Sequence, residues 1–246
     1  MTTEIIKRSR LSHQVAGVLE KEIVSGRLRE GEKLPSERLL MERFSVGRPS
    51  IREALVILNR AGLVAVANGV KARVTRPQPE DLIDGLSSSV KLYLAKPDGV
   101  RHFQNARLLL ECALARNAAT SARPGQIDLI EKALRRNFDA LGTSDFEISD
   151  VEFHFTIAAV TDNPLFVGLH NAVGNWLREQ RATVLRTEGQ DQKAYDFHEQ
   201  VFRAIKAHNP DKAESAMKAH ITSVMEEYWK ARERLQKRRA SPRQTR

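Results

Sequence analysis

Apolar residues recur at intervals of three and four near the start of the chain, which is the spacing of one face of an α-helix. They predict a first helix at about 11–25, with Gly26 placed to end it. A second helix is predicted from Ser36, whose hydroxyl suits the N-cap, to about Phe44. A third begins at Pro49, because proline fits the first position of a helix and an inward-facing apolar stripe follows it.

After the third helix the pattern changes to two short strand-like runs, at 63–66 and 71–75. Asn68-Gly69 lies between them, and both residues tolerate the positive φ angles of a tight hairpin turn. Three helices followed by a hairpin are the element order of a winged helix-turn-helix domain, which we therefore predict for residues 1–76. Two prolines within residues 77–81 resist both helix and central strand and mark a linker.

The rest of the chain is predicted to be almost entirely helical. Two helix starts are clear, because Asn163-Pro164 and Asn209-Pro210 each offer an N-cap followed by proline. The predicted helices lie near 80–95, 100–121, 126–142, 147–160, 164–186, 192–207 and 211–235. We expect a mainly α protein, in which residues 82–233 form an all-α antiparallel helical bundle that follows the winged helix-turn-helix.

Composition excludes several classes of protein. The 246 residues are 41% hydrophobic, enough for a buried core, yet no apolar run is long enough for a transmembrane helix. The first residues, MTTEIIKRSR, lack the apolar stretch of a secretory signal, and the one cysteine, Cys112, cannot form an internal disulfide. We expect a soluble protein of the cytoplasm, a reducing compartment.

The net charge of +9 is unevenly distributed. Residues 1–76 carry 15 Lys and Arg against 8 Asp and Glu, a net charge of +7, whereas residues 77–233 carry a net charge of −4. A strongly basic domain can follow the phosphates of a nucleic acid. Residues 234–246 add +6 and are expected to form a disordered tail, which either solubilises the chain or adds nonspecific attraction to DNA.

The third helix has the pattern of a DNA-recognition helix. Its apolar stripe faces inward, which turns Arg48, Ser50 and Arg52 toward the open side, and arginine can bond two acceptors on guanine at once. The hairpin is expected to enter the adjacent minor groove. The alternative is that these charged residues merely solvate a helix face. The candidate DNA contacts are Arg38, Arg48, Ser50, Arg52, Asn68, Gly69, Lys71 and Arg73.

A carboxylate and three histidines stand beside apolar residues in the predicted bundle. Asp150 and His154 are four residues apart and so share one helix face, while His198 and His220 lie on two later helices. Three imidazoles and a carboxylate on bundle helices could hold a divalent ion such as Zn²⁺, Ni²⁺ or Cu²⁺. The alternative is a set of hydrogen-bonded core histidines without an ion.

The segment LPSERLLMERFSVGRPSIREALVILNRAGLV, continued by NGVKARVTRP, resembles the N-terminal signature of the GntR family of bacterial transcription regulators. The resemblance implies operator contacts by Arg38, Arg48, Arg52 and the Asn68-Gly69 turn. It also implies a homodimer that reads a palindromic operator. Pro49 departs from the members that have a hydroxyl residue at this position.

The helical part resembles the FCD-type ligand-binding domain of the FadR subfamily, whose metal-binding members carry Asp-x3-His and two later histidines. The resemblance implies that the metal ligands are Asp150, His154, His198 and His220. The remaining histidines of this part, His102, His170 and His208, match no ligand position and are expected to be ordinary.

The resemblance also implies an effector, a small carboxylate bound beside the metal. Arg107 lies among leucines and needs an anionic partner, which is either Glu111, four residues later, or the effector. Arg181, in REQRATV, is a second candidate for binding this anion. The segments HFQNARL, SDVEFH, NPLF and NWL are similar to members that respond to sialic acid, which is therefore the leading candidate.

These features predict a DNA-binding transcriptional repressor that acts at the nucleoid and is not an enzyme. It is expected to bind its operator as a homodimer and to respond to a small carboxylate beside a metal ion. One alternative is a metal-sensing regulator whose effector is the ion itself. Another is a zinc-dependent hydrolase fused to a DNA-binding domain, although Glu152 points away from the Asp150–His154 face and offers no general base there.

Overall fold

The computed structural model describes residues 11–65, 72–76, 83, 86–185 and 187–240. The chain divides into two compact units, Met1–Leu82 and Ile83–Arg246, each with a hydrophobic core of its own. Within the described residues, each helix is too short or too polar to cross a membrane.

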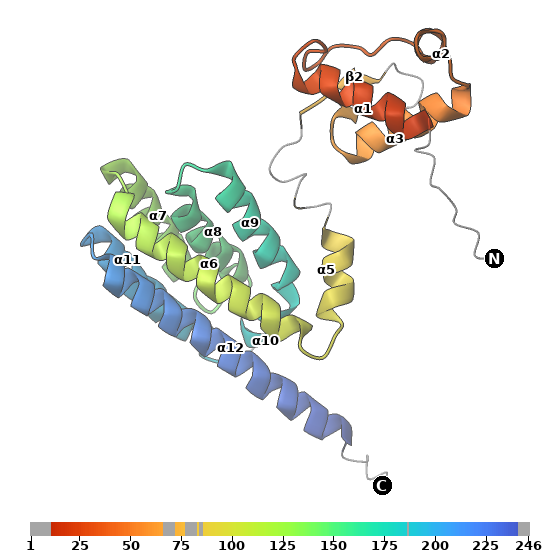
Figure 1. The fold of residues 1–246 in the computed structure, drawn as a ribbon. Coiled ribbons are helices and arrows are strands. Elements are labelled where there is room, and N and C mark those ends of the chain that lie inside the picture. Colours follow the sequence, from red (N-terminus) through yellow and green to blue (C-terminus); the bar gives the residue numbers. More distant parts are fainter. Residues whose placement is uncertain (1–10, 66–71, 77–82, 84–85, 186, 241–246) are drawn as a thin grey trace, which may run out of the picture. The chain divides into compact units, whose positions relative to one another are not determined.

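The described residues of the first unit form three helices and a small sheet, drawn in Figure 1. These elements are α1 (Leu11–Val24), α2 (Glu37–Phe44), α3 (Arg48–Arg60), β1 (Val64–Ala65) and β2 (Arg73–Val74). The two strands are antiparallel, with Val64 opposite Val74. The predicted winged helix-turn-helix is confirmed, while the turn at Asn68-Gly69 lies outside the described residues.

Helix ends in this unit follow the sequence signals. At the start of α2, the Ser36 hydroxyl accepts a hydrogen bond of 3.4 Å from the Leu39 amide. The helix ends at Ser45, whose φ of 53° is left-handed and turns the chain toward α3. The inward faces of α1 and α3 pack together and bury Leu19 and Ile51 completely. This packing leaves the opposite face of α3 exposed.

The second unit is a bundle of helices (Figure 1). They are α5 (Ser87–Leu94), α6 (Gly99–Ser121), α7 (Pro124–Asp139), α8 (Phe146–Ala159), α9 (Pro164–Trp176), α10 (Arg178–Leu185), α11 (Gln190–Lys206) and α12 (Pro210–Ala240). The two longest helices, α6 and α12, pack side by side, and α11 packs against α12. The mainly α fold class is therefore confirmed.

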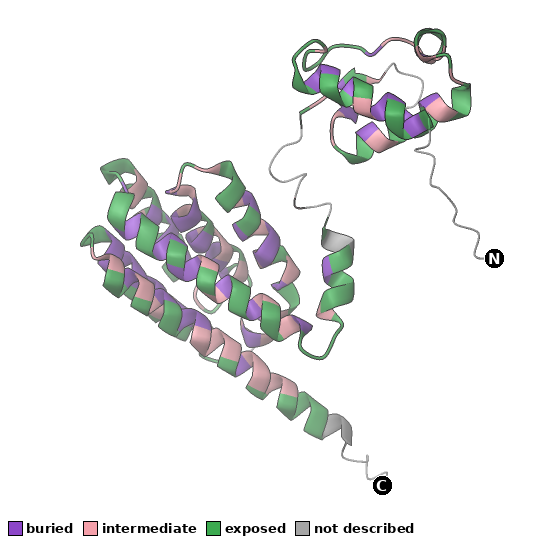
Figure 2. Ribbon diagram, viewed as in Figure 1, coloured by how far each residue is buried: buried purple, intermediate pink, exposed green. Residues whose placement is uncertain are grey.

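The core of this bundle lies between the inward faces of α6, α7, α8, α11 and α12. Figure 2 shows that buried residues follow these inward faces, while residues 233–237 of α12 are exposed. Phe153, Ile157, Ile205 and Met217 have no exposed surface. Buried polar and charged side chains are also present in this unit, and they mark the candidate site.

The structure corrects two predicted boundaries in the second unit. The helix predicted over 164–186 is two helices, because the chain leaves helical geometry at the buried Leu177, with φ −99° and ψ 11°. The helix α12 continues to Ala240, so residues 234–240 of the predicted disordered tail are helical. These residues contain no glycine or proline, and their Lys and Arg favour the negative end of a helix.

Candidate functional site

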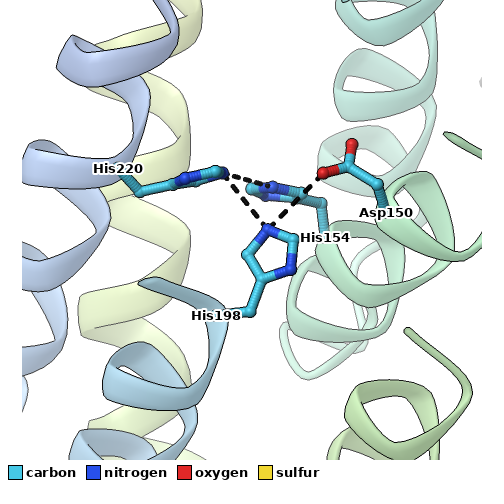
Figure 3. A group of neighbouring side chains, drawn as sticks. All are labelled: Asp150, His154, His198 and His220. Carbon is cyan, nitrogen blue, oxygen red and sulfur yellow. Dashed lines mark hydrogen bonds and ion pairs between the residues drawn. The ribbon is translucent and has the colours of Figure 1, made fainter. Parts of the chain in front are cut away.

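Three helices bring the four predicted metal ligands together. Asp150 and His154 come from α8, His198 from α11 and His220 from α12 (Figure 3). On each helix the ligand lies on the same inward face as core residues. The polar side chain is therefore buried when that face packs into the core. The four residues are between 0% and 5% exposed. One ligand atom from each lies within 4.8 Å of the other three.

The spacing of the donor atoms suits a first-row transition metal. The Nε2 atom of His220 lies 3.3 Å from Nε2 of His154 and 3.2 Å from Nε2 of His198. The Oδ1 atom of Asp150 lies 3.6 Å from Nε2 of His198. Two nitrogens bound to a tetrahedral zinc ion at about 2.0–2.1 Å are about 3.3–3.4 Å apart. The two nitrogen–nitrogen separations therefore match those around such an ion, and the oxygen–nitrogen separation of 3.6 Å is somewhat longer.

A chain of hydrogen bonds fixes which nitrogen of His198 carries the proton. Its Nδ1 atom lies 2.8 Å from Oδ1 of Asn137, which only accepts, so Nδ1 donates. Asn137 donates to the Ser149 hydroxyl at 3.0 Å, and that hydroxyl donates to the Phe146 carbonyl at 2.9 Å. The Phe153 ring stacks on the imidazole, with centroids 4.4 Å apart. The Nε2 atom of neutral His198 therefore presents a lone pair to the centre.

His154 is oriented in the same way by a carboxylate. Its Nδ1 atom lies 3.1 Å from Oε2 of Glu111, so its Nε2 atom also presents a lone pair. The Nδ1 atom of His220 is buried and has no hydrogen-bond partner among the described residues. His220 has at most one proton on Nε2, which cannot be donated fully to the lone pairs of both His154 and His198. A cation, by contrast, can bind all three Nε2 nitrogens. The donor set thus suits a metal ion better than a hydrogen-bonded histidine cluster.

The charge states of these residues also suit a cation. Burial lowers the pKa of His198 to about 3 and that of His220 well below its ordinary value, so both remain neutral, the form that binds metals. Burial alone would raise the pKa of Asp150. The neighbouring His198, His154 and permanently charged Arg181 outweigh it and hold this pKa below its ordinary value. Asp150 is therefore an ionised carboxylate that can bind a cation.

Glu111, on α6, contacts three side chains at once. Its carboxylate lies 3.1 Å from Nδ1 of His154, 3.3 Å from Nε of Arg107 and 3.4 Å from Nε2 of His170. Burial alone would raise the pKa of Glu111, but His154 and His170 hold it well below its ordinary value. Glu111, His154 and His170 form a second group with the spacing of metal ligands. Glu111 therefore connects α6, α8 and α9 beside the candidate metal centre.

The sequence interpretation missed the residues that orient these ligands. Asn137 and Ser149 were not predicted to have a role, Glu111 was considered only as a partner of Arg107, and His170 was expected to be ordinary. Glu111 is 43 positions from His154, and Asn137 is 61 positions from His198. No local spacing marks such pairs, because only the packing of separate helices brings them together.

Both predicted effector contacts lie next to the metal ligands. Arg107 pairs with Glu111, the first of the two partners considered for it, and both are buried. Nε of Arg181 lies 3.2 Å from Oδ2 of Asp150 but makes no hydrogen bond among the described residues. Burial, together with the positive charge of Arg107, lowers the pKa of Arg181, yet a guanidinium remains charged. Two buried cations thus border the candidate metal centre.

Arg181 lines several cavities, of which two bear on ligand binding. A small space of about 20 Å³ is lined by Arg107, Asp150, Arg181 and His220, among others, and has room for about one water molecule. A larger cavity of about 960 Å³ has Arg181 and His170 among its lining residues. Cavities of roughly 300–1,000 Å³ commonly bind small molecules. Space for a small ligand therefore adjoins Arg181.

The first unit presents arginines at the start of α3. The side chains of Arg48 and Arg52 are each 64% exposed. The carboxylate of Glu37 lies between them and accepts from Nε of Arg48 at 2.8 Å and Nε of Arg52 at 3.2 Å. The hydrogen bond from Arg48, aided by Arg52, lowers the pKa of Glu37. The predicted recognition arginines are therefore on the surface and share one carboxylate.

The other DNA-contact candidates have different surroundings. Arg38 is exposed and pairs with Glu42 on α2. Ser50 is half-buried, and the exposed Arg73 donates to the Gly31 carbonyl at 2.8 Å. The remaining candidates, Asn68, Gly69 and Lys71, lie outside the described residues.

Comparison with known proteins agrees with this architecture. Residues 11–74 match the family of bacterial regulatory proteins called the gntR family, and residues 103–223 match the FCD domain. The HTH-type transcriptional repressor NanR of Edwardsiella tarda (strain FL6-60) is 41% identical over 220 residues, 88% of this chain and 85% of that protein. NanR of Escherichia coli (strain K12) is 42% identical over 222 residues, 89% of this chain and 84% of that protein. The solved structure of a Streptococcus agalactiae GntR protein gives a TM-score of 0.61 at 26% identity, covering 87% of this chain and 98% of that one.

A winged helix-turn-helix with exposed arginines, joined to an FCD domain, defines a DNA-binding transcriptional regulator. The chain belongs to the GntR family of bacterial regulatory proteins. The hydrolase alternative is therefore wrong, since relatives that match most of the chain are repressors. In addition, Glu152 forms an exposed ion pair with Arg136 instead of serving the centre.

Proposed function

We propose that this regulator is a repressor, active at the nucleoid in the cytoplasm, that binds a palindromic operator as a homodimer. A small carboxylate releases it from the operator by binding beside a divalent ion held by Asp150, His154, His198 and His220. The observation that carries the proposal is the convergence of three imidazole nitrogens and a carboxylate on one buried point, next to two buried arginines.

The ion is Zn²⁺, or else Ni²⁺ or another divalent transition metal, because imidazole nitrogen and carboxylate oxygen suit such ions. When bound, it supplies a concentrated positive charge and a coordination position for an anion. His154 and His198 direct their Nε2 lone pairs toward it, and Asp150 provides negative charge. His220 completes the set with the nitrogen that faces the other two rings.

A carboxylate is the effector class that the neighbouring residues favour. Arg181 shares Asp150 with the ion, so the ion weakens the ion pair of Arg181 and leaves this buried cation in need of an anion. The carboxylate of an effector meets that need. The cavity of about 960 Å³ beside Arg181 accommodates a sugar acid. Similarity to repressors named NanR makes sialic acid the leading candidate.

The effector acts on DNA binding through the equilibrium between two arrangements of the dimer. A ligand shifts such an equilibrium only by its difference in affinity for the two states. A coupling free energy of about 1–3 kcal/mol would change operator affinity about 5- to 150-fold. Ordinary ligand affinities at the FCD domain are therefore enough to switch repression.

A metal-sensing regulator is the second candidate. The ion pair between Arg181 and Asp150, at 3.2 Å, favours it, because ion binding alone would change the partner of Arg181. Operator binding with and without a chelator, in the absence of any sugar acid, separates the two candidates. Release by zinc alone would support metal sensing, whereas release that requires both zinc and a carboxylate would support the first proposal.

A thermal-shift screen of sugar acids and small carboxylates, with and without zinc, tests the main proposal. A supporting hit raises Tm only in the zinc-loaded protein and releases a duplex that the protein has selected from a random-sequence library. His198→Ala should remove the zinc measured by elemental analysis, whereas His102→Ala, at an exposed position on α6, should keep it. Full zinc retention by His198→Ala would contradict the ligand set.

A further inference from the structure

We propose that Glu37 is a positioning residue for operator recognition, which holds Arg48 and Arg52 ready to read bases and disfavours binding to unrelated DNA. The inference rests on operator binding by the winged helix-turn-helix. It assigns a role in that binding to an acidic residue of a basic domain. It concerns the first unit alone and is independent of the metal and the effector.

The geometry places one carboxylate across two successive turns of α3. Arg48 and Arg52 are four residues apart, so their side chains leave the helix on the same face. Oε2 of Glu37 accepts from Nε of Arg48 at 2.8 Å, and Oε1 accepts from Nε of Arg52 at 3.2 Å. Oε2 also accepts from Nε of Arg52 at 3.4 Å, so one carboxylate holds both arginines and fixes the two guanidinium groups relative to each other.

The contacts leave the DNA-binding ends of both arginines available. They engage the Nε atoms, while the two terminal nitrogens of each guanidinium take no part in them. Those terminal nitrogens can donate to the O6 and N7 acceptors of guanine in the major groove. Glu37 can therefore remain bonded while Arg48 and Arg52 contact bases.

The backbone around Glu37 determines where its carboxylate lies. Glu37 is the first residue of α2, and the preceding Ser36 caps that helix through the Leu39 amide. A carboxylate at the positive end of a helix is also favoured by the helix dipole. The left-handed turn at Ser45 then sets α2 against α3. The position of the carboxylate is thus determined by helix geometry as well as by its own ion pairs.

Glu37 differs from the other acidic partners of arginines in this unit. Glu42 pairs with Arg38, four residues away on the same helix, through an exposed contact. Glu22 is largely buried and pairs with Arg43, which connects α1 to α2. Among the described residues, Glu37 is the carboxylate that joins two predicted base-reading side chains. Its contacts therefore bear on recognition more directly than on stability.

Two physical effects make such a carboxylate favour the correct sequence. A long arginine side chain loses conformational freedom when it binds a base, and a side chain held in place beforehand loses less. The negative charge of Glu37 also repels phosphates that approach loosely, which weakens sequence-independent contacts. Both effects raise the ratio of operator affinity to nonspecific affinity.

Three variants of the full chain test the inference. Glu37→Gln removes the charge, Glu37→Asp keeps the charge but is too short to bridge both arginines, and Glu20→Gln, at an exposed position on α1, removes an equal charge elsewhere. Fluorescence anisotropy would measure dissociation constants for the duplex that the wild-type protein selects from a random-sequence library. A shuffled duplex of the same composition gives the nonspecific value, and circular dichroism verifies folding.

We expect both Glu37 variants to lower the ratio of operator affinity to shuffled-duplex affinity by about tenfold, within the range for one base-reading arginine. Glu20→Gln should leave the ratio at the wild-type value. Equal ratios for Glu37→Gln and Glu20→Gln would overturn the inference, as would a wild-type ratio for Glu37→Asp. If the wild-type protein selected no sequence at all, operator binding itself would fail and the inference with it.

Discussion

At the scale of single residues, the orientation of His198 depends on side chains that never reach the candidate ion. Its Nδ1 proton is held by Asn137, which is fully buried and is itself held by Ser149. Partners of this kind fix the tautomer and the ring orientation of a metal-binding histidine. The strength of metal binding should therefore respond to a change at Asn137, which is one hydrogen bond away from a ligand.

The first prediction concerns Asn137→Ala, which leaves all four ligands in place. We expect zinc affinity to fall about 10- to 100-fold, because His198 loses the acceptor that holds its ring. Competition with a chromogenic chelator measures this change. Asn117→Ala, at an exposed position on α6, should bind zinc like the wild-type protein. Equal affinities in both variants would mean that Asn137 does not position the ligand.

The second prediction is that acid destabilises the metal-free protein. The pKa of His198 is about 3 in the folded chain, and that of His220 is also lowered, against an ordinary value of 6.5. Below pH 6.5 the unfolded chain binds protons that the folded chain does not, so stability decreases as the pH falls. Each histidine contributes up to about 1.4 kcal/mol per pH unit in this range.

Calorimetry in the presence of a chelator, from about pH 7.5 to about pH 5.5, measures the effect as a falling Tm. The lowered pKa values of Asp150 and Glu111 act in the same direction, but only once the pH approaches the ordinary range of carboxyl groups. His102→Ala, which changes an exposed histidine, should show the same dependence as the wild-type protein. A Tm that does not change over this range would contradict the buried, neutral state of His198.

Single residues also show what the sequence could and could not reveal about the site. Asp150 and His154 could be paired from their spacing, because four residues are about one helical turn. His198 and His220 could be named as candidates because each stands beside apolar residues on a later predicted helix, and the family resemblance then implied that they are ligands. The roles of Glu111 and Asn137 could not be predicted, because they depend on contacts between helices far apart in the chain.

At the scale of elements, α3 exposes the turn that carries Arg48 while its inner face is fixed against α1. The third prediction is that Arg48→Ala weakens binding to the selected operator by about 1–3 kcal/mol and affects a shuffled duplex less. Arg60→Ala, at an exposed position in the last turn of α3, removes the same charge and should not discriminate between the two duplexes. An equal loss on both duplexes would make Arg48 a phosphate contact.

Helix starts were easier to predict than helix ends. Asn163 and Asn209 each accept from a backbone amide at 3.0 Å, as their place before a proline predicted. The break between α9 and α10 at Leu177 was missed, since a buried leucine is compatible with a continuous helix. Local chemistry caps a helix at its start, whereas this break accompanies the packing of α10 against α12 and α8.

At the scale of the whole molecule, the DNA-binding unit and the FCD unit have separate cores. The fourth prediction is that removal of the metal abolishes effector response before it affects folding or operator binding. With chelator, the carboxylate found in the screen should no longer release the operator, while the helical circular dichroism spectrum and the operator dissociation constant remain close to their zinc-loaded values. Loss of the helical spectrum upon chelation would contradict this order.

Evolution can change Glu111 only together with its neighbours. A shorter or neutral side chain there would remove the anionic partner of Arg107, His154 and His170 at the same time, because all three contact the same carboxylate. Single substitutions at any of the four positions should therefore be rare among descendants that keep the response, and replacements should arise as coordinated sets. An alignment of related repressors in which these four positions vary together would reveal this dependence without any protein being purified.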